Sequence, residues 1–455
     1  MSTKQPSRGE IEALASWMLE QAEKGGARGA DLLYSFSTSY ELELRDGQPE
    51  DCSYGLSGGI GIRVIGEGGR QGVAFGNRFD RAALADLVSW SLANCANSEP
   101  EEGITLYKGE LERDDSLDLF DETVAGGVAP EERMRRCLEM TEAAKDADPR
   151  VVSVRSASWG DGFGESFYAS SAGAFGWRQS TAVSCGAAVV LGDGESFEMG
   201  AYGKSARFVE DLDGAAYARL AVGRTARVLG GKPLPTGKYT LILDPEISAS
   251  IVDEIGELFC ASDVHRGRSL MKGRLGQSVA GSVVTLLDDG RIPRAMGSSP
   301  YDGEGVPTGK TTLIDGGIAR SFLYNMQYAL KDGVSSTGNA ARSLSGLPDV
   351  GTSNLILSPG TESPAALRSN VREGFLVLEL MGLHTLDPVS GDFSLGAKGI
   401  YMKNGVEYGP VAGVTIAGNL LDLMRRISAI GNDHEFFGST GASTVIVEDV
   451  AVAGE

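Results

Sequence analysis

The first half of the chain groups its helix-like and strand-like patterns into separate blocks. Apolar side chains recur three to four positions apart in four segments, which predicts amphipathic helices over 10–24, 80–97, 130–146 and 212–229. Runs rich in β-branched and aromatic residues predict strands over 31–45, 55–65 and 71–75. Four shorter runs separated by glycine turns predict an antiparallel meander over 151–160, 165–171, 182–192 and 196–203. Such segregated blocks are typical of an α+β fold.

A run of glycine and proline at 230–235 interrupts both patterns and predicts a domain boundary. We therefore expect an N-terminal α+β domain over residues 1–231, built as an antiparallel sheet with flanking helices, and a C-terminal domain over 236–455. The second domain is rich in glycine and in strand patterns, which predicts an antiparallel β-barrel or sandwich closed by hairpins. Only one clear helix is predicted late in this domain, over 417–430.

The second domain opens with a strand, a tight turn and a helix. Asp244-Pro245 is a typical cap and first position of a helix, which we expect to span 245–261. One face of this helix is apolar, whereas the other carries Asp253, Glu254 and Glu257. Zinc that activates water is held largely by imidazole, whereas carboxylates without histidine favour harder ions or no ion. The same three carboxylates are also typical of a solvent-exposed helix face. A carboxylate metal site and a plain exposed surface therefore both stay open as interpretations.

The composition of the chain argues against nucleic acids and membranes as binding partners. The chain has 455 residues, enough for two or three domains, and a formal net charge of −21. Nucleic-acid binding needs clustered Lys and Arg, so direct contact with DNA or RNA is not expected. No stretch approaches the roughly 20 apolar residues of a membrane span, and the polar start does not resemble a signal peptide. We expect a cytoplasmic protein that does not bind membranes.

Cysteine and histidine are scarce. The five cysteines are widely spaced and form no Cys-x-x-Cys pair, which predicts reduced, mostly buried thiols. The only histidines are His265, His384 and His434. Candidate metal ligands are His434, whose segment 432–435 is also typical of a capping or surface loop, and His265. His384 lies among turn residues, where exposure explains it.

Several long strings resemble the TldD/PmbA family, the so-called modulators of DNA gyrase. The strongest matches are DGEGVPTGKTTLIDGGIARSFLYN, STGNAAR and DPVSGDFSLGAKGIYMKNGVEYGPVAGVTIAGNLLDLMRRISAIGND, at 302–325, 336–342 and 387–433. GGIGIRVI at 58–65 and SSAGAFGWRQS at 170–180 extend the resemblance over nearly the whole chain.

The resemblance implies an α+β first domain, a barrel-like second domain and proteolysis of peptides by a two-subunit complex. The TldD-type subunit carries a His-Glu-x-x-x-His helix and a late cysteine as zinc ligands. In this chain Val252 and Glu257 stand where the histidines would be, Asp253 where the glutamate would be, and 438–444 contains no cysteine. The chain therefore resembles the PmbA (TldE) type, which lacks the zinc site.

Three hypotheses follow. The first is a non-catalytic subunit, holding an extended peptide at an exposed edge of the barrel sheet, in a heterodimer with a zinc-bearing TldD-type partner or in a homodimer. The second is a self-sufficient hydrolase that uses Asp253, Glu254 and Glu257 with His265 or His434 around an ion such as Mn²⁺ or Mg²⁺. The third is a regulatory module acting on protein partners related to gyrase or to toxin–antitoxin systems, since the acidic surface favours protein over DNA.

Overall fold

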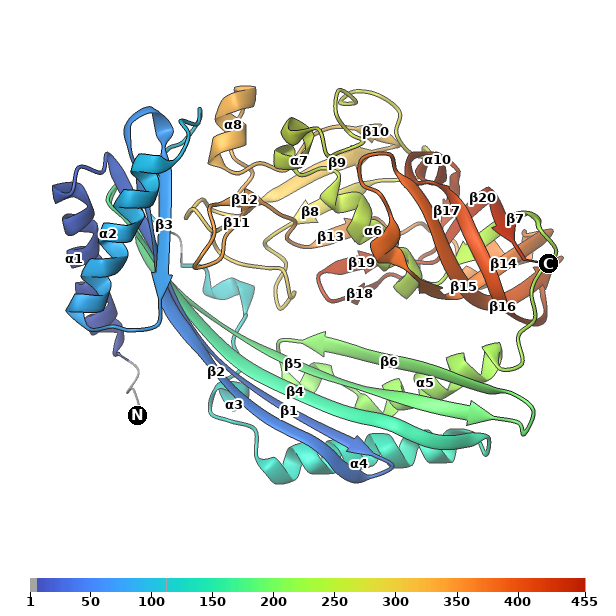
Figure 1. The fold of residues 1–455 in the computed structure, drawn as a ribbon. Coiled ribbons are helices and arrows are strands. Elements are labelled where there is room, and N and C mark those ends of the chain that lie inside the picture. The colour runs from blue at the N-terminus through green and yellow to red at the C-terminus, as the bar shows by residue number, and fades with distance from the viewer. Residues whose placement is uncertain (1–5, 112, 455) are drawn as a thin grey trace.

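The computed structural model describes residues 6–111 and 113–454 (Figure 1). Its α-helices are α1 (Arg8–Lys24), α2 (Arg81–Asn97), α3 (Glu122–Ala125), α4 (Pro130–Ala147), α5 (Gly214–Val228), α6 (Pro245–Glu257), α7 (Ala261–Arg266), α8 (Met326–Asp332), α9 (Pro364–Ser369) and α10 (Leu420–Arg425). Short 3-10 helices lie at η1 (Glu67–Gly69), η2 (Asp115–Leu117), η3 (Val209–Asp211) and η4 (Leu383–Thr385). None of these helices is both long and apolar enough to cross a membrane.

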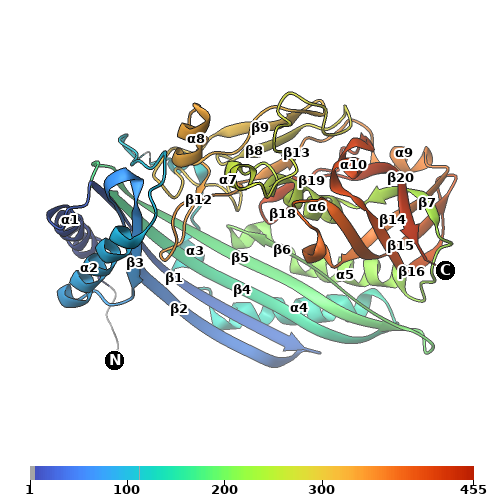
Figure 2. The same cartoon turned by 45° about the horizontal axis from the view of Figure 1, so that its top comes forward.

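The N-terminal part, up to the end of α5, is built on one long antiparallel sheet. Its strands follow the order β3-β2-β1-β4-β5-β6. They are β1 (Gly29–Arg45), β2 (Gln48–Ile65), β3 (Gln71–Gly76), β4 (Val151–Ser170), β5 (Phe175–Gly192) and β6 (Phe197–Ala206). Both views show this sheet as a curved layer beneath the C-terminal part (Figures 1 and 2).

Alternation along the strands gives the sheet an apolar face and an opposite face that carries small residues over parts of β4, β5 and β6. On β1, Leu32 and Tyr34 pack under α1 and α2, and Leu42 and Leu44 pack against α4 and α5. We call this the helix face. Since successive side chains in a strand point to opposite sides, Ser35 and its alternate neighbours point to the other face, which we call the open face. The open face is turned toward the C-terminal part.

The C-terminal part contains a closed barrel and a second sheet. The barrel joins β16-β15-β14-β7-β20 and closes where Thr415–Ala417 pair with Ala451–Ala453. A six-stranded sheet of order β10-β9-β8-β13-β19-β18 lies beside it, and β17 extends the barrel sheet past β20. The strands are β7 (Gly237–Leu243), β8 (Leu286–Asp289), β9 (Lys310–Asp315), β10 (Ile318–Ala319), β11 (Ala340–Ala341), β12 (Asp349–Val350), β13 (Leu355–Leu357), β14 (Glu373–Met381), β15 (Asp392–Lys403), β16 (Val406–Asn419), β17 (Ile427–Ile430), β18 (Glu435–Phe437), β19 (Thr440–Ala442) and β20 (Val445–Ala453).

This architecture confirms the predicted α+β class and the barrel, with two pairings that the sequence did not indicate. β7 pairs with β14 in parallel, and so does β13 with β19. Closure pairs β16 with β20 only over Thr415–Ala417 and Ala451–Ala453, so the expected edge for an extended peptide is occupied along that stretch and stays a prediction elsewhere.

The predicted elements differ from the structure in several details. The four short strands over 151–203 are three long ones, because the glycines between the first two, in 160–164, stay paired within β4. The segment predicted as a helix over 417–430 is instead the end of β16, the short α10 and β17. Barrel closure holds Ala417 in a strand, and α10 starts at Leu420 because the Asn419 side chain accepts a hydrogen bond from the backbone N–H of Leu421. The strand-rich second domain also contains short helices α7, α8 and α9, which are too brief for a periodic pattern.

Candidate functional site

Helix α6 forms because its start is well capped and one of its faces is buried. The Asp244 side chain accepts a hydrogen bond from the backbone N–H of Glu246 at 3.1 Å, and Pro245 takes the first helical position. Ile251, Val252 and Ile255 are buried in the C-terminal core. The helix ends at Glu257, four residues earlier than predicted, because the chain turns there and starts α7 at Ala261.

The structure brings together the two segments that the resemblance assigns to a zinc site. α6 packs against β18 and β19, so the hairpin at 435–442 lies beside the acidic face of the helix. The hydroxyl of Thr440 donates a hydrogen bond to Oδ1 of Asp253 at 2.8 Å, and Thr440 is buried. The scaffold of the site is therefore assembled, with a threonine and an aspartate in contact at its centre.

The side chains on this scaffold do not fit zinc. Val252 is 5% exposed and packs among aliphatic residues, so its position offers no donor atom. Asp253 and Glu257 are exposed carboxylates, and the hairpin segment offers neither sulfur nor nitrogen side chains at 438–444. Among the described residues no three His, Cys, Asp or Glu side chains are grouped as a metal site requires.

The acidic residues of α6 repel one another. Burial raises the pKa of Glu254, and the charge of Asp253 adds to that rise. Desolvation by the protein around its carboxylate raises the pKa of Glu257 although the side chain as a whole is exposed, and the charges of Asp253 and Asp263 add to that rise. The Cys260 thiol donates to Glu257 Oε2 at 3.8 Å, a weak contact that opposes this shift. The helix face thus concentrates negative charge.

The histidine candidates lie in separate places, and the buried Nε2 of His434 has no hydrogen-bond partner among the described residues. His265 Nε2 lies 2.8 Å from Asp332 Oδ1, and its ring contacts Tyr328. His434 is half-buried, its ring meets Phe436 edge to face, and burial lowers its pKa. His384 is exposed in η4, as expected. The structure gathers neither His265 nor His434 with the carboxylates of α6 into a ligand set.

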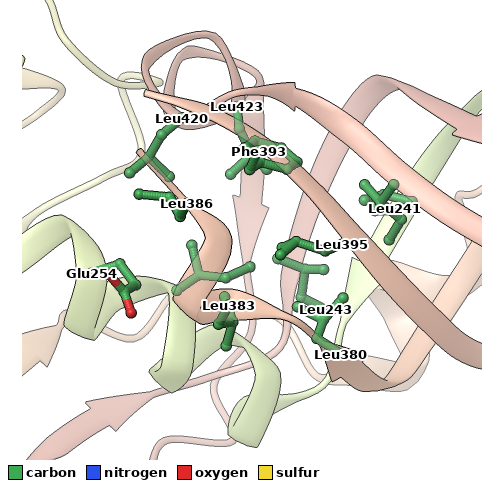
Figure 3. A pocket seen from close by; sticks show the side chains of 12 residues that line it. Leu241, Leu243, Glu254, Leu380, Leu383, Leu386, Phe393, Leu395, Leu420 and Leu423 are labelled. Atoms are coloured by element: carbon green, nitrogen blue, oxygen red, sulfur yellow. The ribbon is translucent and has the colours of Figure 1, made fainter. Parts of the chain in front are cut away.

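Glu254 lies at the rim of an aliphatic pocket between α6, the β14–β15 connection and the barrel (Figure 3). The remaining lining residues are apolar: Leu241, Leu243, Ile251, Leu380, Leu383, Leu386, Phe393, Leu395, Ile416, Leu420 and Leu423. Its cavity volume of about 20 Å³ is close to the space one water molecule needs. The pocket is thus a small gap in the core and has no room for a substrate.

A much larger groove runs between α6 and the open face of the N-terminal sheet. Two adjoining cavities of about 500 and 400 Å³ share Ala188, Ala201, Glu246 and Ser250. Glu246 and Ser250 are four residues apart on α6, and Asp253 and Glu257 continue the same stripe at helical spacing. The groove therefore leads along the helix toward the contact between Asp253 and Thr440.

The floor of the groove is made of small side chains on three neighbouring strands. These residues are Ser156, Ser158, Ser184, Gly186, Ala188, Ala201, Gly203 and Ser205. Because such side chains project little, the main chain of the sheet lies close to the groove. The sequence contains a pattern that could have revealed this floor. In 184–188 and 201–205 small residues alternate with Cys185, Ala187 and Tyr202, which lie on the helix face. Sequence reasoning missed it because it depends on which part of the molecule covers the open face.

Ion pairs fix the walls of the groove. Lys204 on β6 pairs with Glu435 and donates to the carbonyl oxygen of Phe436 at 2.9 Å. At the far end, Arg224 of α5 contacts Asp244 and Glu246 at 2.9 and 3.0 Å. These contacts join the N-terminal part to both the hairpin and the start of α6, so the groove is a built feature of the fold.

A buried charge network holds the two parts together elsewhere. Arg63 Nη2 contacts Asp31 Oδ2 at 2.5 Å, and Arg342 Nη1 contacts Asp31 Oδ1 at 2.8 Å. Arg63 also lies 3.6 Å from Glu304. Burial would raise the pKa of Asp31, but Arg342 and Arg63 outweigh it and hold that pKa below its ordinary value. Arg342 and Glu304 lie in the family strings, which therefore include residues of the interface between the two parts.

Comparison with known proteins places this geometry in one family. Profiles of the PmbA/TldA metallopeptidases match three stretches of the chain, as domain 1 over 30–95, the central domain over 125–229 and the C-terminal domain over 236–454. The metalloprotease PmbA of Escherichia coli O157:H7 is 27% identical over 452 residues, covering 98% of this chain and 96% of that protein. A metalloprotease TldD homolog of Haemophilus influenzae is 25% identical over 425 residues, covering 89% and 86%.

Solved structures share the whole fold. A protein of Thermotoga maritima named as a modulator of a DNA gyrase superposes with a TM-score of 0.88 at 25% identity, covering 97% of this chain and 100% of that one. One of Bacteroides thetaiotaomicron with the same kind of name gives 0.87 at 27%, covering 98% and 99%. TldE from Thermococcus kodakarensis gives 0.85 at 20% identity, covering 98% and 100%, a likeness of fold alone.

Proposed function

Since the chain belongs to the PmbA/TldD metallopeptidase family, we propose that it is the non-catalytic PmbA (TldE) type subunit of a two-subunit peptidase in the cytoplasm. A TldD-type partner would hold zinc and cut the peptide, while this chain would bind part of it. One observation carries the proposal: α6 and the β18–β19 hairpin meet as a site scaffold, but Val252 and Thr440 lie there without nitrogen or sulfur ligands.

The groove supports a role in peptide binding. An extended peptide needs a channel whose walls allow main-chain contact, and the small side chains of β4, β5 and β6 provide such a floor. The groove also passes along α6, so a peptide lying in it would run beside the positions that correspond to the partner's catalytic ones. Its role is therefore to hold and orient substrate, with bond cleavage left to the partner.

The groove can be tested by filling it. Ala188 lines both cavities, so Ala188→Trp should block the groove, whereas Ser89→Trp places the same side chain on the exposed surface of α2. We expect a TldD-type subunit to cleave a long peptide at least roughly tenfold faster with the wild-type chain than with Ala188→Trp. Ser89→Trp should match the wild type. Equal cleavage by the partner alone would refute the proposal.

Elemental analysis separates this function from a self-sufficient hydrolase. The purified chain should retain no stoichiometric zinc or manganese after chelation and re-exposure, and Glu254→Ala and Glu257→Ala should change nothing. Near-stoichiometric metal that both variants lose would instead establish a carboxylate site on α6 and overturn the non-catalytic assignment.

A further inference from the structure

A third cavity, of about 300 Å³, lies on the open face of the N-terminal sheet, separate from the groove. Residues of β1, β4 and β5 line one side of it, and the loop at 298–300 of the C-terminal part lines another. Its basic lining residues are Arg178 and Arg207, and serines supply most of its other polar side chains. We call this cavity the arginine pocket.

Arg178 is held in place by three hydrogen bonds and keeps unused donors. Its Nε donates to Ser166 Oγ at 2.8 Å, and its Nη1 donates to Ser299 Oγ at 2.9 Å and to the carbonyl oxygen of Tyr301 at 3.1 Å. A guanidinium group carries five N–H donors, two of them on Nη2. No atom of the described residues accepts a hydrogen bond from Nη2 of Arg178, so a fixed pair of N–H groups stays available.

Arg207 is more deeply buried, at 8% exposed, and its partners are uncharged. Its guanidinium donates to the carbonyl oxygens of Thr181 at 3.0 Å, of Ala295 at 3.5 Å and of Met296. Burial lowers the pKa of Arg207, and no carboxylate opposes that shift as a neighbouring acid would. Among the described residues, neither arginine of the pocket forms an ion pair with Asp or Glu.

The acidic residue in the lining is directed to the other side of the sheet. Glu165 alternates along β4 with Gly164 and Ser166, and it shares its face with Phe167, which packs on the helix face. There it pairs with Arg8 at 3.2 Å. Within the described part of the chain, the two positive charges of the pocket therefore stay unbalanced. Burying a charge without a partner is costly, so an anion that entered this pocket would be stabilised.

Small residues of β4 and β5 extend from this pocket to the groove. Arg178 and Ser184 lie an even number of positions apart on β5 with no irregularity between them, so both point to the open face. Gly160 and Gly164 lie beside them on β4. A Cβ added at either glycine would come within 4 Å only of sheet atoms among the described residues. The C-terminal part therefore does not rest on the sheet at these two positions.

We propose that the arginine pocket binds the C-terminal carboxylate of an extended peptide whose preceding residues lie along this floor toward the groove. The proposal rests on the peptide-holding role proposed above and adds the group by which the peptide is anchored. The planar fork of arginine matches a carboxylate through two parallel hydrogen bonds, and the serine hydroxyls offer further donors. From Arg178 to Ser184 an extended strand covers about 20 Å, so roughly six peptide residues reach the groove floor.

Paired peptides that differ only at the C-terminus test this site. An unstructured peptide of about ten residues spans the floor and the groove; it contains no Asp or Glu, carries a fluorophore at its N-terminus and is made as the acid and as the amide. In anisotropy titrations the wild-type chain should bind the acid at least roughly tenfold more tightly, because the amide cannot form the charged hydrogen-bonded pair. Arg178→Gln should bind both forms equally. Arg219→Gln, at an exposed position of α5, should keep the preference.

A second substitution leaves Arg178 and its contacts between the two parts in place. Ser180 lines the pocket two positions from Arg178 and points to the same face. Ser180→Glu should place a carboxylate beside the arginines and remove the preference for the acid. Ser180→Gln introduces a side chain of nearly the same size without the charge, and it should retain the preference.

Four results would overturn the carboxylate site, and they separate it from the peptide-holding role. Equal affinity of the wild-type chain for acid and amide would leave the groove as a peptide site without this anchor. A preference for the acid that survives in both Arg178→Gln and Ser180→Glu would place the anion elsewhere. Binding of inorganic phosphate, with acid and amide still equal, would assign the pocket to a phosphate group. Binding of neither peptide, by the chain alone or with a TldD-type partner, would overturn the peptide-holding role as well.

Discussion

Single buried carboxylates show how much their surroundings set their ionisation. Asp302 accepts hydrogen bonds from the backbone N–H groups of Glu304, Val306 and Ala340, each at 2.9 Å. Burial and the neighbouring Glu304 nevertheless outweigh these bonds and raise the pKa of Asp302 to about 7. Asp31, close to the same network, is held ionised by two arginines. The presence or absence of a neighbouring arginine therefore explains why the pKa of one buried aspartate is lowered and that of the other is raised.

The raised pKa of Asp302 predicts a specific pH dependence. The ordinary pKa of an aspartate is 3.8. Between pH 3.8 and about 7 the carboxyl group of Asp302 is therefore protonated in the folded protein and ionised in the unfolded chain. The contribution of Asp302 to the free energy of unfolding is therefore full below 3.8 and falls as pH rises toward about 7. In Asp302→Asn this fall should be absent, whatever the baseline stability.

Urea unfolding of the wild type and the variant across this pH range measures the difference. Asp387→Asn is the control, because hydrogen bonds that Asp387 accepts from Val389 and Ser390 lower its pKa and move its effect to more acidic solutions. Parallel pH profiles for wild type and Asp302→Asn would contradict the assignment.

At the scale of elements, some positions must be glycine because another stretch of main chain lies too close for a Cβ atom. A Cβ added to Gly61 of β2 would lie 2.0 Å from the carbonyl oxygen of Leu344. Strand β2 therefore touches the C-terminal part through a residue without a side chain. At Gly409 of β16 an added Cβ would meet nothing within 4 Å.

We expect Gly61→Ala to lower the free energy of unfolding by about 1–3 kcal/mol, because either the strand or the loop at Leu344 must shift. Gly409→Ala should be neutral or stabilise by up to about 1 kcal/mol. Chemical unfolding measures both. A Gly61→Ala protein as stable as the wild type would show that the loop moves without cost.

The sequence predicted those elements that are determined by local signals. Helix α6 was predictable because its signals are local: the Asp244 cap, Pro245 and an apolar stripe. The helix over 417–430 failed because a pairing with residues more than 30 positions later, at Ala451–Ala453, holds Ala417 in a strand. The carboxylates of α6 were identified as candidates, but the groove was not. Its floor and its roof come from opposite sides of the domain junction.

At the scale of the whole molecule, buried charges tie the two parts into one unit. Arg342 comes from the C-terminal part, is 1% exposed in its side chain and contacts Asp31 of β1. Removing one partner of a buried ion pair leaves an uncompensated charge. The contacts of Lys204 and Arg224 add further links across the groove.

Arg342→Met should lower the free energy of unfolding by about 3–5 kcal/mol and separate the unfolding of the two parts. Calorimetry should therefore give one transition for the wild type and two for the variant. Lys238→Met removes an exposed pair with Asp449 and should cost about 1 kcal/mol or less. A wild type that already unfolds in two steps would contradict this account.

The floor of the groove has a further consequence for selectivity. Side-chain pockets let a site distinguish one amino acid from another, and a surface of serine, glycine and alanine offers none. An occupant would be sorted by its width and by its ability to stay extended. We therefore expect tolerance of many different peptide sequences and discrimination against folded or bulky segments.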